Sequence, residues 1–324
     1  SSCSDRLIIT PLIGTFYRVR MGGPVLTFFL FGKPYQRGFF CNDESLNHPF
    51  KESTVTSLML YVVGFFLPVC TMLAGEYYTW KSCGGQSSIM LLGRVIPSWV
   101  AMAYSKIGLF GYGAAMTALA TDIAKYTIGR LRPHFMQVCK PAVDCSLAAN
   151  QHRYFEDVPC TAKNVSARLM KELRLSFPSG HSSFSAYTMV WLALYLQLRV
   201  TWKGSKLLKH FLQFVCLMMA WFTAMTRISN YKHHWSDVLA GLSLGTLVAL
   251  VTVSINSLCE PSTPSDEHSG PERPSAVSSW ERQKRKNSFT DGMSLVGSVC
   301  RKKIVISSTA RPRTGDLEEC ARLE

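Results

Sequence analysis

Long apolar stretches separated by short polar segments are the main pattern in this sequence. Residues 54–75, 100–121 and 238–258 are each long enough for an α-helix to cross a bilayer, and only Lys106 places a charge within them. Residues 184–198 and 207–225 are apolar but shorter, so helices there would need extended ends or a locally thinner bilayer. Five such stretches favour a membrane protein over the alternative, the buried helices of a large soluble protein.

The N-terminal region is less regular. Residues 7–17 and 21–32 are apolar, but Arg18 and Arg20 stand between them, and a convincing cleavage site for a signal peptide is lacking. We count this region provisionally as an irregular first span, which makes six in all. The alternatives are an interfacial segment and the mark of an incomplete chain.

Composition divides the chain into parts. Of the 324 residues, 47% are hydrophobic and 17% are charged, and the formal net charge is +14. This composition argues against a disordered chain and against a solvated nucleic-acid-binding protein. Residues 260–324 hold 11 basic and 10 acidic residues, whereas residues 1–259 hold 24 basic and 11 acidic residues. We therefore predict an irregular N-terminal segment (1–33), a membrane-embedded core (34–259) and a disordered cytoplasmic tail (260–324) rich in Pro and Ser.

The distribution of Lys and Arg in short loops indicates which loops face the cytoplasm. The segment 199–209, between the fourth and fifth predicted spans, has four basic residues and no acidic residue, so we place it in the cytoplasm. The tail lies on the same side, because two spans separate it from that segment. The segments 31–53, 122–183 and 226–237 then face outward, toward the cell exterior or a lumen.

The outward segments have features of an extracellular or lumenal environment. Four of the 11 cysteines lie there, where an oxidising compartment permits disulfides of undetermined pairing: Cys41, Cys139, Cys145 and Cys160. A glycosylation sequon begins at Asn164. Residues 122–177 hold nine basic and five acidic residues. Topology alone would not place this positive charge outward, so we expect an anionic ligand there.

The first of three clusters of candidate functional residues follows the third span and contains Lys125, Arg130, Arg132 and Pro133. On a continued helix, Lys125 and Arg132 are two turns apart and share a face. Two cations on one face suit a phosphate, because Arg offers a planar fork of donors and Lys a mobile charge. A basic anchor at the membrane edge is the alternative interpretation.

The second cluster, residues 177–183, opens the fourth span with the sequence Phe-Pro-Ser-Gly-His-Ser-Ser. Gly180 lets the backbone approach a ligand closely, and the free N–H groups at a helix start can hold an anion. Ser179 adds a donor, and His181 titrates near neutral pH, so it can transfer a proton. The alternative is an ordinary helix start with a bystander His.

The third cluster, residues 226–237, leads into the last span and includes Arg227, His233, His234 and Asp237. His233 and Asp237 are neighbours on a helix, where a carboxylate can fix the imidazole tautomer and make one ring nitrogen nucleophilic. The alternatives are a polar helix start at the membrane interface and a metal site formed by His233, His234 and Asp237. All three clusters lie at span edges on the same predicted side.

Together the three clusters resemble the three-part signature of the type 2 phosphatidic acid phosphatases. The signature reads here Lys125-x6-Arg132-Pro133, Pro178-Ser179-Gly180-His181 and Thr226-Arg227-x5-His233-x3-Asp237. The flanking residues 34–43 and 231–241 are similar to those of animal lipid phosphate phosphatases, and the resemblance extends over residues 34–258. The chain departs from the family at Thr226, where Ser is usual. Because the hydroxyl is kept, we expect activity to survive.

The resemblance implies a fold and a mechanism. The fold is an all-α, polytopic membrane bundle of six transmembrane helices, the first irregular in this chain, with outward loops that carry a site needing no metal or other cofactor. By the resemblance, His233 is the nucleophile that forms a phosphohistidine, Asp237 orients His233, and His181 is the general acid and base. The residues that bind the phosphoryl oxygens are then Lys125, Arg132, Ser179, Gly180 and Arg227.

The sequence thus predicts an integral-membrane enzyme of the plasma membrane or an endomembrane. Its substrates would be lipid phosphate monoesters: phosphatidate, lysophosphatidate, sphingosine 1-phosphate and ceramide 1-phosphate. No nucleic acid is expected as a partner, and a homo-oligomer is compatible with the sequence. A non-enzymatic relative that binds phospholipids and acts through protein partners is a competing class, but it would lack some of the catalytic residues, which are all present. A channel or transporter would need polar groups along its mid-span faces.

Overall fold

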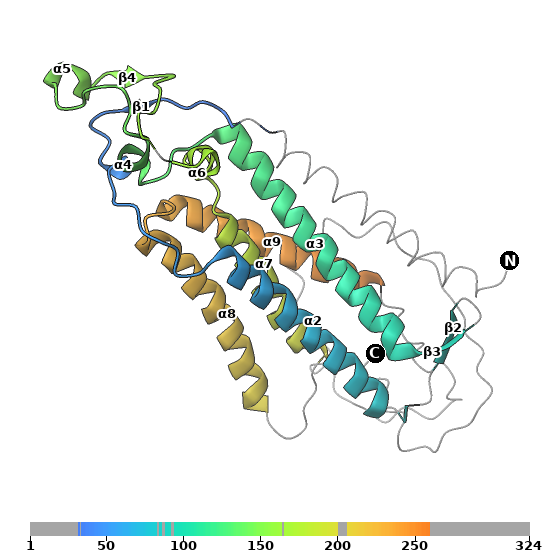
Figure 1. The fold of residues 1–324 in the computed structure, drawn as a ribbon. Coiled ribbons are helices and arrows are strands. Elements are labelled where there is room, and N and C mark those ends of the chain that lie inside the picture. Colours follow the sequence, from blue (N-terminus) through green and yellow to red (C-terminus); the bar gives the residue numbers. More distant parts are fainter. Residues whose placement is uncertain are drawn as a thin grey trace, which may run out of the picture. The chain divides into compact units, whose positions relative to one another are not determined.

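Five long helices dominate the computed structural model, which describes residues 32, 34–82, 84–85, 88–91, 94–163, 165–199 and 206–259. The long helices are α2 (Ser57–Ser82), α3 (Ser98–Ile128), α7 (Gly180–Arg199), α8 (Lys206–Ser229) and α9 (Trp235–Cys259) (Figure 1). The chain divides into two units, Ser1–Val253 and Ser254–Glu324. All residues of the candidate site lie in the first unit.

The five long helices coincide with the five apolar stretches of the sequence. Four are long and apolar enough to cross a membrane: Ser57–Ser82, Ser98–Ile128, Leu207–Ser229 and Trp235–Ile255. Helix α7 has 20 residues, and a helix of that length extends about 30 Å, the thickness of the hydrocarbon core. It begins at Gly180, ahead of the apolar stretch that predicted it, and so needs no thinner bilayer. The predicted first span lies outside the described residues.

Helix α7 is the central helix of the bundle and packs against α2, α3 and α8. Its side chains, among them Phe184 and Tyr187, form a hydrophobic cluster with Phe110 of α3. Thr188 is also buried, and its hydroxyl donates to the Phe184 carbonyl at 3.0 Å. Because neighbouring helices surround α7, it can carry polar side chains that a lipid-facing helix would not tolerate.

Helix α2 extends beyond the apolar stretch that predicted it and brings Glu76 into the bundle. The Glu76 carboxylate is buried and forms ion pairs with Lys106 of α3 at 3.1 Å and with Arg199 of α7 at 2.9 Å. The Tyr195 hydroxyl donates to the same carboxylate at 3.0 Å. The charge of Lys106, which interrupts an apolar stretch in the sequence, is thus compensated from a neighbouring helix.

Two glycines fix the helix ends near the candidate site. Gly129 ends α3 in the left-handed conformation, with φ of 59°, which glycine adopts without steric cost. On α9, a β-carbon at Gly241 would lie 2.6 Å from the Ser179 carbonyl oxygen and 3.1 Å from the Ser182 β-carbon. The missing side chain therefore lets the start of α9 lie directly against the start of α7.

Short elements cover one end of the helices, which we call the loop end (residues 34–56, 129–179 and 230–234; Figure 1). They are β1 (Phe39–Phe40), the 3-10 helix η1 (Glu44–Leu46), α4 (Phe135–Cys139), α5 (Ala148–Gln151), β4 (Tyr154–Phe155) and α6 (Ala167–Glu172). Strand β1 pairs antiparallel with β4, and Phe39 packs with Leu131 and Phe135 in a second hydrophobic cluster. Between α2 and α3, β2 (Ser88–Leu91) and β3 (Arg94–Pro97) form an antiparallel hairpin at the opposite end.

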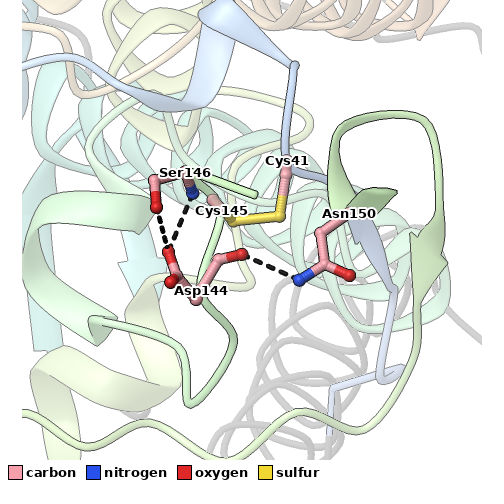
Figure 2. Close-up of a disulfide and its surroundings, with 5 residues drawn as sticks. All are labelled: Cys41, Asp144, Cys145, Ser146 and Asn150. Atoms are coloured by element: carbon pink, nitrogen blue, oxygen red, sulfur yellow. Dashed lines mark hydrogen bonds between the residues drawn. A yellow bond between two sulfur atoms is a disulfide. The ribbon is translucent and has the colours of Figure 1, made fainter. Parts of the chain in front are cut away.

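Two disulfides tie the loop end together: Cys41–Cys145, drawn in Figure 2, and Cys139–Cys160. These are the four cysteines that the sequence places in the outward segments, and the structure supplies their pairing. Beside the first disulfide, the Asp144 carboxylate accepts hydrogen bonds from the backbone N–H and the hydroxyl of Ser146, at 2.9 and 2.6 Å. The loop around Cys145 is thus held by covalent and polar contacts together.

Candidate active site

The three clusters of candidate residues meet at the loop end. The first lies at the C-terminal end of α3, the second at the start of α7, and the third between α8 and α9 (Figure 1). A cavity of about 470 Å³ receives basic and histidine side chains, and a glycine, from all three: Lys125, Arg132, Gly180, His181, Arg227, Lys232 and His233. Two predicted site residues, Ser179 and Asp237, are fully buried and do not line the cavity.

His233 is held by a backbone carbonyl. Its Nδ1 lies 2.7 Å from the Ser176 carbonyl oxygen and 3.9 Å from Oδ2 of Asp237. Because a carbonyl only accepts, Nδ1 carries the hydrogen and Nε2 keeps a lone pair. Burial and the positive charges of Arg132 and Lys125 lower the pKa of His233 well below its ordinary value. The ring is therefore neutral at neutral pH and can act as a nucleophile.

Asp237 lies closer to Ser176, the residue that holds His233, than to His233 itself. Its Oδ2 accepts a hydrogen bond from the Ser176 hydroxyl at 2.6 Å and one from the backbone N–H of His234 at 3.0 Å. Its Oδ1 forms an ion pair with Arg130 at 2.5 Å. In this geometry the carboxylate fixes Ser176, whose carbonyl in turn fixes His233. That Asp237 orients His233 during a reaction stays a prediction.

His181 opens α7 and lines the same cavity as His233. Its ring lies near the backbone of Val55. Its Nε2 is buried and has no hydrogen-bond partner among the residues that the structure describes. An imidazole that lines a cavity and has a ring nitrogen without a protein partner is suited to move a proton to or from a bound molecule.

Three cations of the predicted phosphate site surround the two histidines. Lys125 pairs with Asp122 at 3.6 Å, Arg132 pairs with Glu172 at 3.9 Å, and Arg227 is 1% exposed. Within the described ranges, the Nε groups of Arg132 and Arg227 are buried without a hydrogen-bond partner. Buried cationic donors without acceptors are costly, and a bound anion would satisfy them.

Thr226 supports Arg227. The Nη2 of Arg227 donates to the Thr226 hydroxyl at 3.3 Å, and that hydroxyl donates to the Thr223 carbonyl at 2.7 Å. On its other side, Nη1 of Arg227 donates to the Ser53 hydroxyl at 3.4 Å. The contact with Arg227 uses only the hydroxyl that Thr shares with Ser. This geometry gives a physical reason for expecting that Thr can replace Ser at position 226.

Ser179 and Gly180 shape the start of α7. The Ser179 hydroxyl oxygen accepts a hydrogen bond from the Ser182 hydroxyl at 3.0 Å, and the Ser179 backbone N–H donates to the Asp237 carbonyl at 3.0 Å. A β-carbon at Gly180 would lie 2.9 Å from Nζ of Lys125. Glycine therefore lets a cation approach the helix start, where backbone N–H groups also favour an anion.

Sequence reasoning missed the segment 48–55, which precedes α2 and contacts the second and third clusters. Its contacts are Ser53 with Arg227, Thr54 with Asn230, and Val55 with His181. It also missed Ser176 and Arg130 as partners of Asp237. Most of these contacts use main-chain atoms or small hydroxyls, which leave no recognisable motif, and the Arg130–Asp237 ion pair joins residues far apart in the sequence. The predicted glycosylation site, Asn164, lies outside the described residues.

The cavity also has an apolar part between α2 and α3. Its lining there is Leu60, Tyr61 and Phe65 of α2 and Gly111, Ala114, Ala115 and Ala118 of α3. Polar and apolar linings thus share one cavity, which suits an amphiphilic ligand. Within the part of the chain that the structure describes, no group of three or more His, Cys, Asp or Glu side chains is arranged to hold a metal ion.

Comparison with known proteins identifies relatives of this chain. The PAP2 superfamily matches residues 106–259. Phospholipid phosphatase 2 of Homo sapiens is 40% identical over 227 residues, which are 69% of this chain and 74% of the human protein. Phospholipid phosphatase 2 of Mus musculus is 38% identical over 261 residues, which are 79% of this chain and 90% of the mouse protein.

Two further relatives differ in the share of each chain that the match covers. A Drosophila melanogaster protein named as a phosphatidate phosphatase is 50% identical over 244 residues, 72% of this chain, which span 64% of the fly protein's length. Among solved structures, a transmembrane PAP2-type phosphatidylglycerolphosphate phosphatase from Bacillus subtilis is 19% identical. That match has a TM-score of 0.34 and covers 63% of this chain and 80% of the bacterial one. On the extent of its identity with the human and mouse proteins, this chain belongs to the phospholipid phosphatases of the PAP2 superfamily.

Proposed function

We propose that this protein is an integral-membrane phosphatase that hydrolyses phosphate monoesters of lipids through a phosphohistidine intermediate, without a metal ion. The observation that carries the proposal is one cavity in which His181 and His233 lie beside Arg132 and Arg227, whose Nε groups are buried without a hydrogen-bond partner in the described part of the chain. The names of the relatives, phospholipid phosphatase and phosphatidate phosphatase, support the same class of substrate.

In the first half of the reaction, Nε2 of His233 attacks the phosphorus atom, and the bond from phosphorus to the lipid oxygen breaks. His181 donates a proton to the departing oxygen, so the lipid leaves as a neutral alcohol and the phosphoryl group stays on His233. The Ser176 carbonyl keeps the hydrogen on Nδ1 and stabilises the charge that the ring acquires. Asp237 acts by holding the Ser176 hydroxyl.

In the second half, the neutral His181 takes a proton from water, and the water oxygen attacks phosphorus. The bond between phosphorus and Nε2 of His233 breaks, and inorganic phosphate leaves. His181 then holds the proton that it donates in the next cycle. The same imidazole therefore serves as acid in one step and as base in the other.

Fixed cations supply the electrostatic stabilisation that this mechanism needs. Lys125, Arg132, Arg227 and Gly180 line the cavity and bind the phosphoryl oxygens, whereas Ser179, which does not line it, supports the start of α7 through its hydrogen bonds with Ser182 and Asp237. Phosphoryl transfer depends mainly on positioning and on stabilising charge spread over the equatorial oxygens. Three cations already in place can fill the role that metal ions have in other phosphatases, which is why we propose no cofactor.

The apolar part of the cavity supports lipid substrates. Membrane-spanning helices α2 and α3 form it, so an acyl chain can lie there while its phosphate reaches His233. We propose phosphatidate, lysophosphatidate, sphingosine 1-phosphate and ceramide 1-phosphate as substrates. The active site faces the cell exterior or a lumen, and the tail is cytoplasmic.

Phosphate release from micellar phosphatidate, with EDTA present, tests the proposal. We expect release by the purified wild-type chain and a loss of about a thousand-fold or more in His233→Ala. His152→Ala is the control, because His152 is an exposed histidine of the loop end. Absence of release from the wild type, or equal release from His233→Ala, would contradict the proposal. Binding of phosphatidate without release would instead favour the non-enzymatic, phospholipid-binding class.

A second experiment tests the intermediate and the choice of substrate. Rapid quenching with a radiolabelled lipid phosphate should trap an acid-labile label on the peptide that contains His233, and the four proposed lipids should all release phosphate. A label on another residue would exclude His233 as the nucleophile. Release that depends on added metal after EDTA treatment would exclude the metal-free mechanism.

A further inference from the structure

The nucleophile stands at the end of a tight turn between α8 and α9. The backbone N–H groups of Lys232 and His233 both donate to the Arg227 carbonyl, at 3.0 and 3.3 Å. Tyr231 lies within this turn with φ of 53°. Residues other than glycine keep a left-handed conformation only where surrounding contacts fix it. The direction of His233 therefore depends on what holds Tyr231.

Two other segments hold Tyr231. Its ring stacks on His48, with centroids 4.5 Å apart and planes 2° apart, and Nζ of Lys51 lies 4.7 Å from its centroid. Its carbonyl oxygen lies 2.8 Å from Nδ1 of His134, which directly follows the first cluster. Because the carbonyl accepts, Nδ1 of His134 carries the hydrogen.

His134 is well suited to a fixed structural contact. Its side chain is 0% exposed, and the ring of Phe50 meets it edge to face at 5.2 Å between centroids. Burial is the main cause that lowers the pKa of His134 to about 4, with a smaller effect from Arg132. The ring thus stays neutral in the physiological range, so it keeps its one hydrogen on Nδ1 and gains no second hydrogen on Nε2 as the pH changes.

We propose that His134 is a positioning residue for the nucleophile. Its Nδ1–H fixes the Tyr231 carbonyl, which fixes the turn from Arg227 to His233 and hence the direction of Nε2 on His233. The contact also links the first cluster, which supplies Arg132, to the third, which supplies the nucleophile. The kinetic consequence rests on the proposed function, whereas the structural consequence can be measured without it.

Three variants separate the hydrogen bond from side-chain volume. His134→Asn places an amide N–H close to the position of Nδ1 and can keep the bond to Tyr231. His134→Gln places its amide near the position of Nε2, which is buried without a partner in the described part of the chain. His134→Leu removes the donor. A misplacement of about 1 Å can cost about a hundred-fold in rate.

We therefore expect His134→Leu and His134→Gln to lose roughly ten- to a hundred-fold in kcat, with KM changed by less than about three-fold. We expect His134→Asn to stay within about three-fold of the wild type in both. Hydrogen–deuterium exchange of the peptide over residues 228–233 should quicken in the Leu and Gln variants and stay unchanged in the Asn variant.

The outcomes distinguish this proposal from the proposed function. Unchanged exchange in His134→Leu, or a His134→Asn that matches His134→Gln in exchange and kcat, overturns the positioning role. If His134→Leu does not fold, the comparison of His134→Asn with His134→Gln still decides whether His134 has the positioning role. If the wild type releases no phosphate, the proposed function fails, and the exchange measurement alone decides on His134.

Discussion

The main chain orients His233 of the candidate site. His233 donates to the Ser176 carbonyl at 2.7 Å, and the ring of His181 lies near the backbone of Val55. A carbonyl fixes an imidazole without placing a negative charge beside it, so Nε2 of His233, which we propose as the nucleophile, keeps the neighbouring cations free to attract an anionic substrate. The carboxylate of Asp237 lies one contact further away, where it holds the Ser176 hydroxyl.

Lys232 gives the site a pH dependence on the alkaline side. It lines the cavity as its fourth cation, and its Nζ lies 3.7 Å from the centroid of the Phe50 ring. Burial and then the charges of Arg132 and Arg227 lower the pKa of Lys232 to about 8. The ammonium is charged below this pKa and neutral above it, so attraction for a phosphate dianion is present below about pH 8 and declines above it. We expect kcat/KM to fall with a midpoint near pH 8.

Two variants test this assignment. Lys232→Arg keeps its charge to higher pH and should move the midpoint upward, whereas Lys232→Met should lower kcat/KM roughly ten-fold already at pH 7. Lys140→Met, a change of an exposed lysine of the loop end, should alter neither value. An alkaline midpoint that is the same in the wild type and Lys232→Arg would exclude Lys232 as its origin.

Site residues differ in how visible they are in a sequence. His181, His233 and Arg227 could be predicted, because their chemistry depends on one side-chain type and their spacing follows helix geometry. The contacts of Ser176 and Val55 could not, because a backbone group is present at every position. His134 could not either, since its role depends on a turn that forms only when α8 and α9 meet.

The polar network inside the bundle acts at the scale of helices. Glu76 of α2 is shared by Lys106 of α3 and Arg199 of α7, so one carboxylate joins three helices. Removing it would leave two buried cations without the carboxylate that they share. We expect Glu76→Ala to lower the free energy of unfolding by about 3–5 kcal/mol, measured by thermal or denaturant unfolding in detergent.

A surface ion pair provides the matched control for this prediction. Arg168 and Glu172 form an ion pair at 3.1 Å, and the Arg168 side chain is 81% exposed. Arg168→Ala should therefore cost less than about 1 kcal/mol. If Glu76→Ala costs no more than Arg168→Ala, the buried network does not stabilise the bundle.

Helix positions could be predicted because a helix needs about 20 mainly apolar residues to cross the hydrocarbon core of a bilayer. For this reason α2, α3, α8 and α9 coincide with apolar stretches. The limits of α2 and α7 could not, because Glu76 is buried with its ion-pair partners on other helices, and Ser182 is buried with its hydroxyl bonded to Ser179. A hydropathy profile detects segments that contact lipid, whereas these two residues contact other parts of the protein.

At the scale of the whole molecule, each end of α7 lies beside a different group of basic residues. His181 and the cavity lie at its N-terminal end, and Arg199 opens the basic segment 199–209 at its C-terminal end. If α7 crosses the membrane, these groups face opposite sides. The basic segment then follows the positive-inside tendency, and the cations around His233 lie outward, where the proposed phosphate ligand accounts for their charge.

The Cys41–Cys145 disulfide allows this sidedness to be measured, because it lies at the loop end with the site and both residues are partly exposed. Intact cells that display the chain would receive a membrane-impermeant reductant and then an impermeant maleimide, with labelled peptides identified by mass spectrometry. We expect label on Cys41 and Cys145 only after reduction, and label on Cys300 and Cys320 of the predicted cytoplasmic tail only after permeabilisation. Label on the tail cysteines of intact cells, with Cys41 and Cys145 protected, would reverse the proposed orientation. An oxidising compartment preserves such a disulfide whereas the cytosol reduces it, so the same experiment tests whether the covalent contacts of the loop end and the proposed outward active site share one side of the membrane.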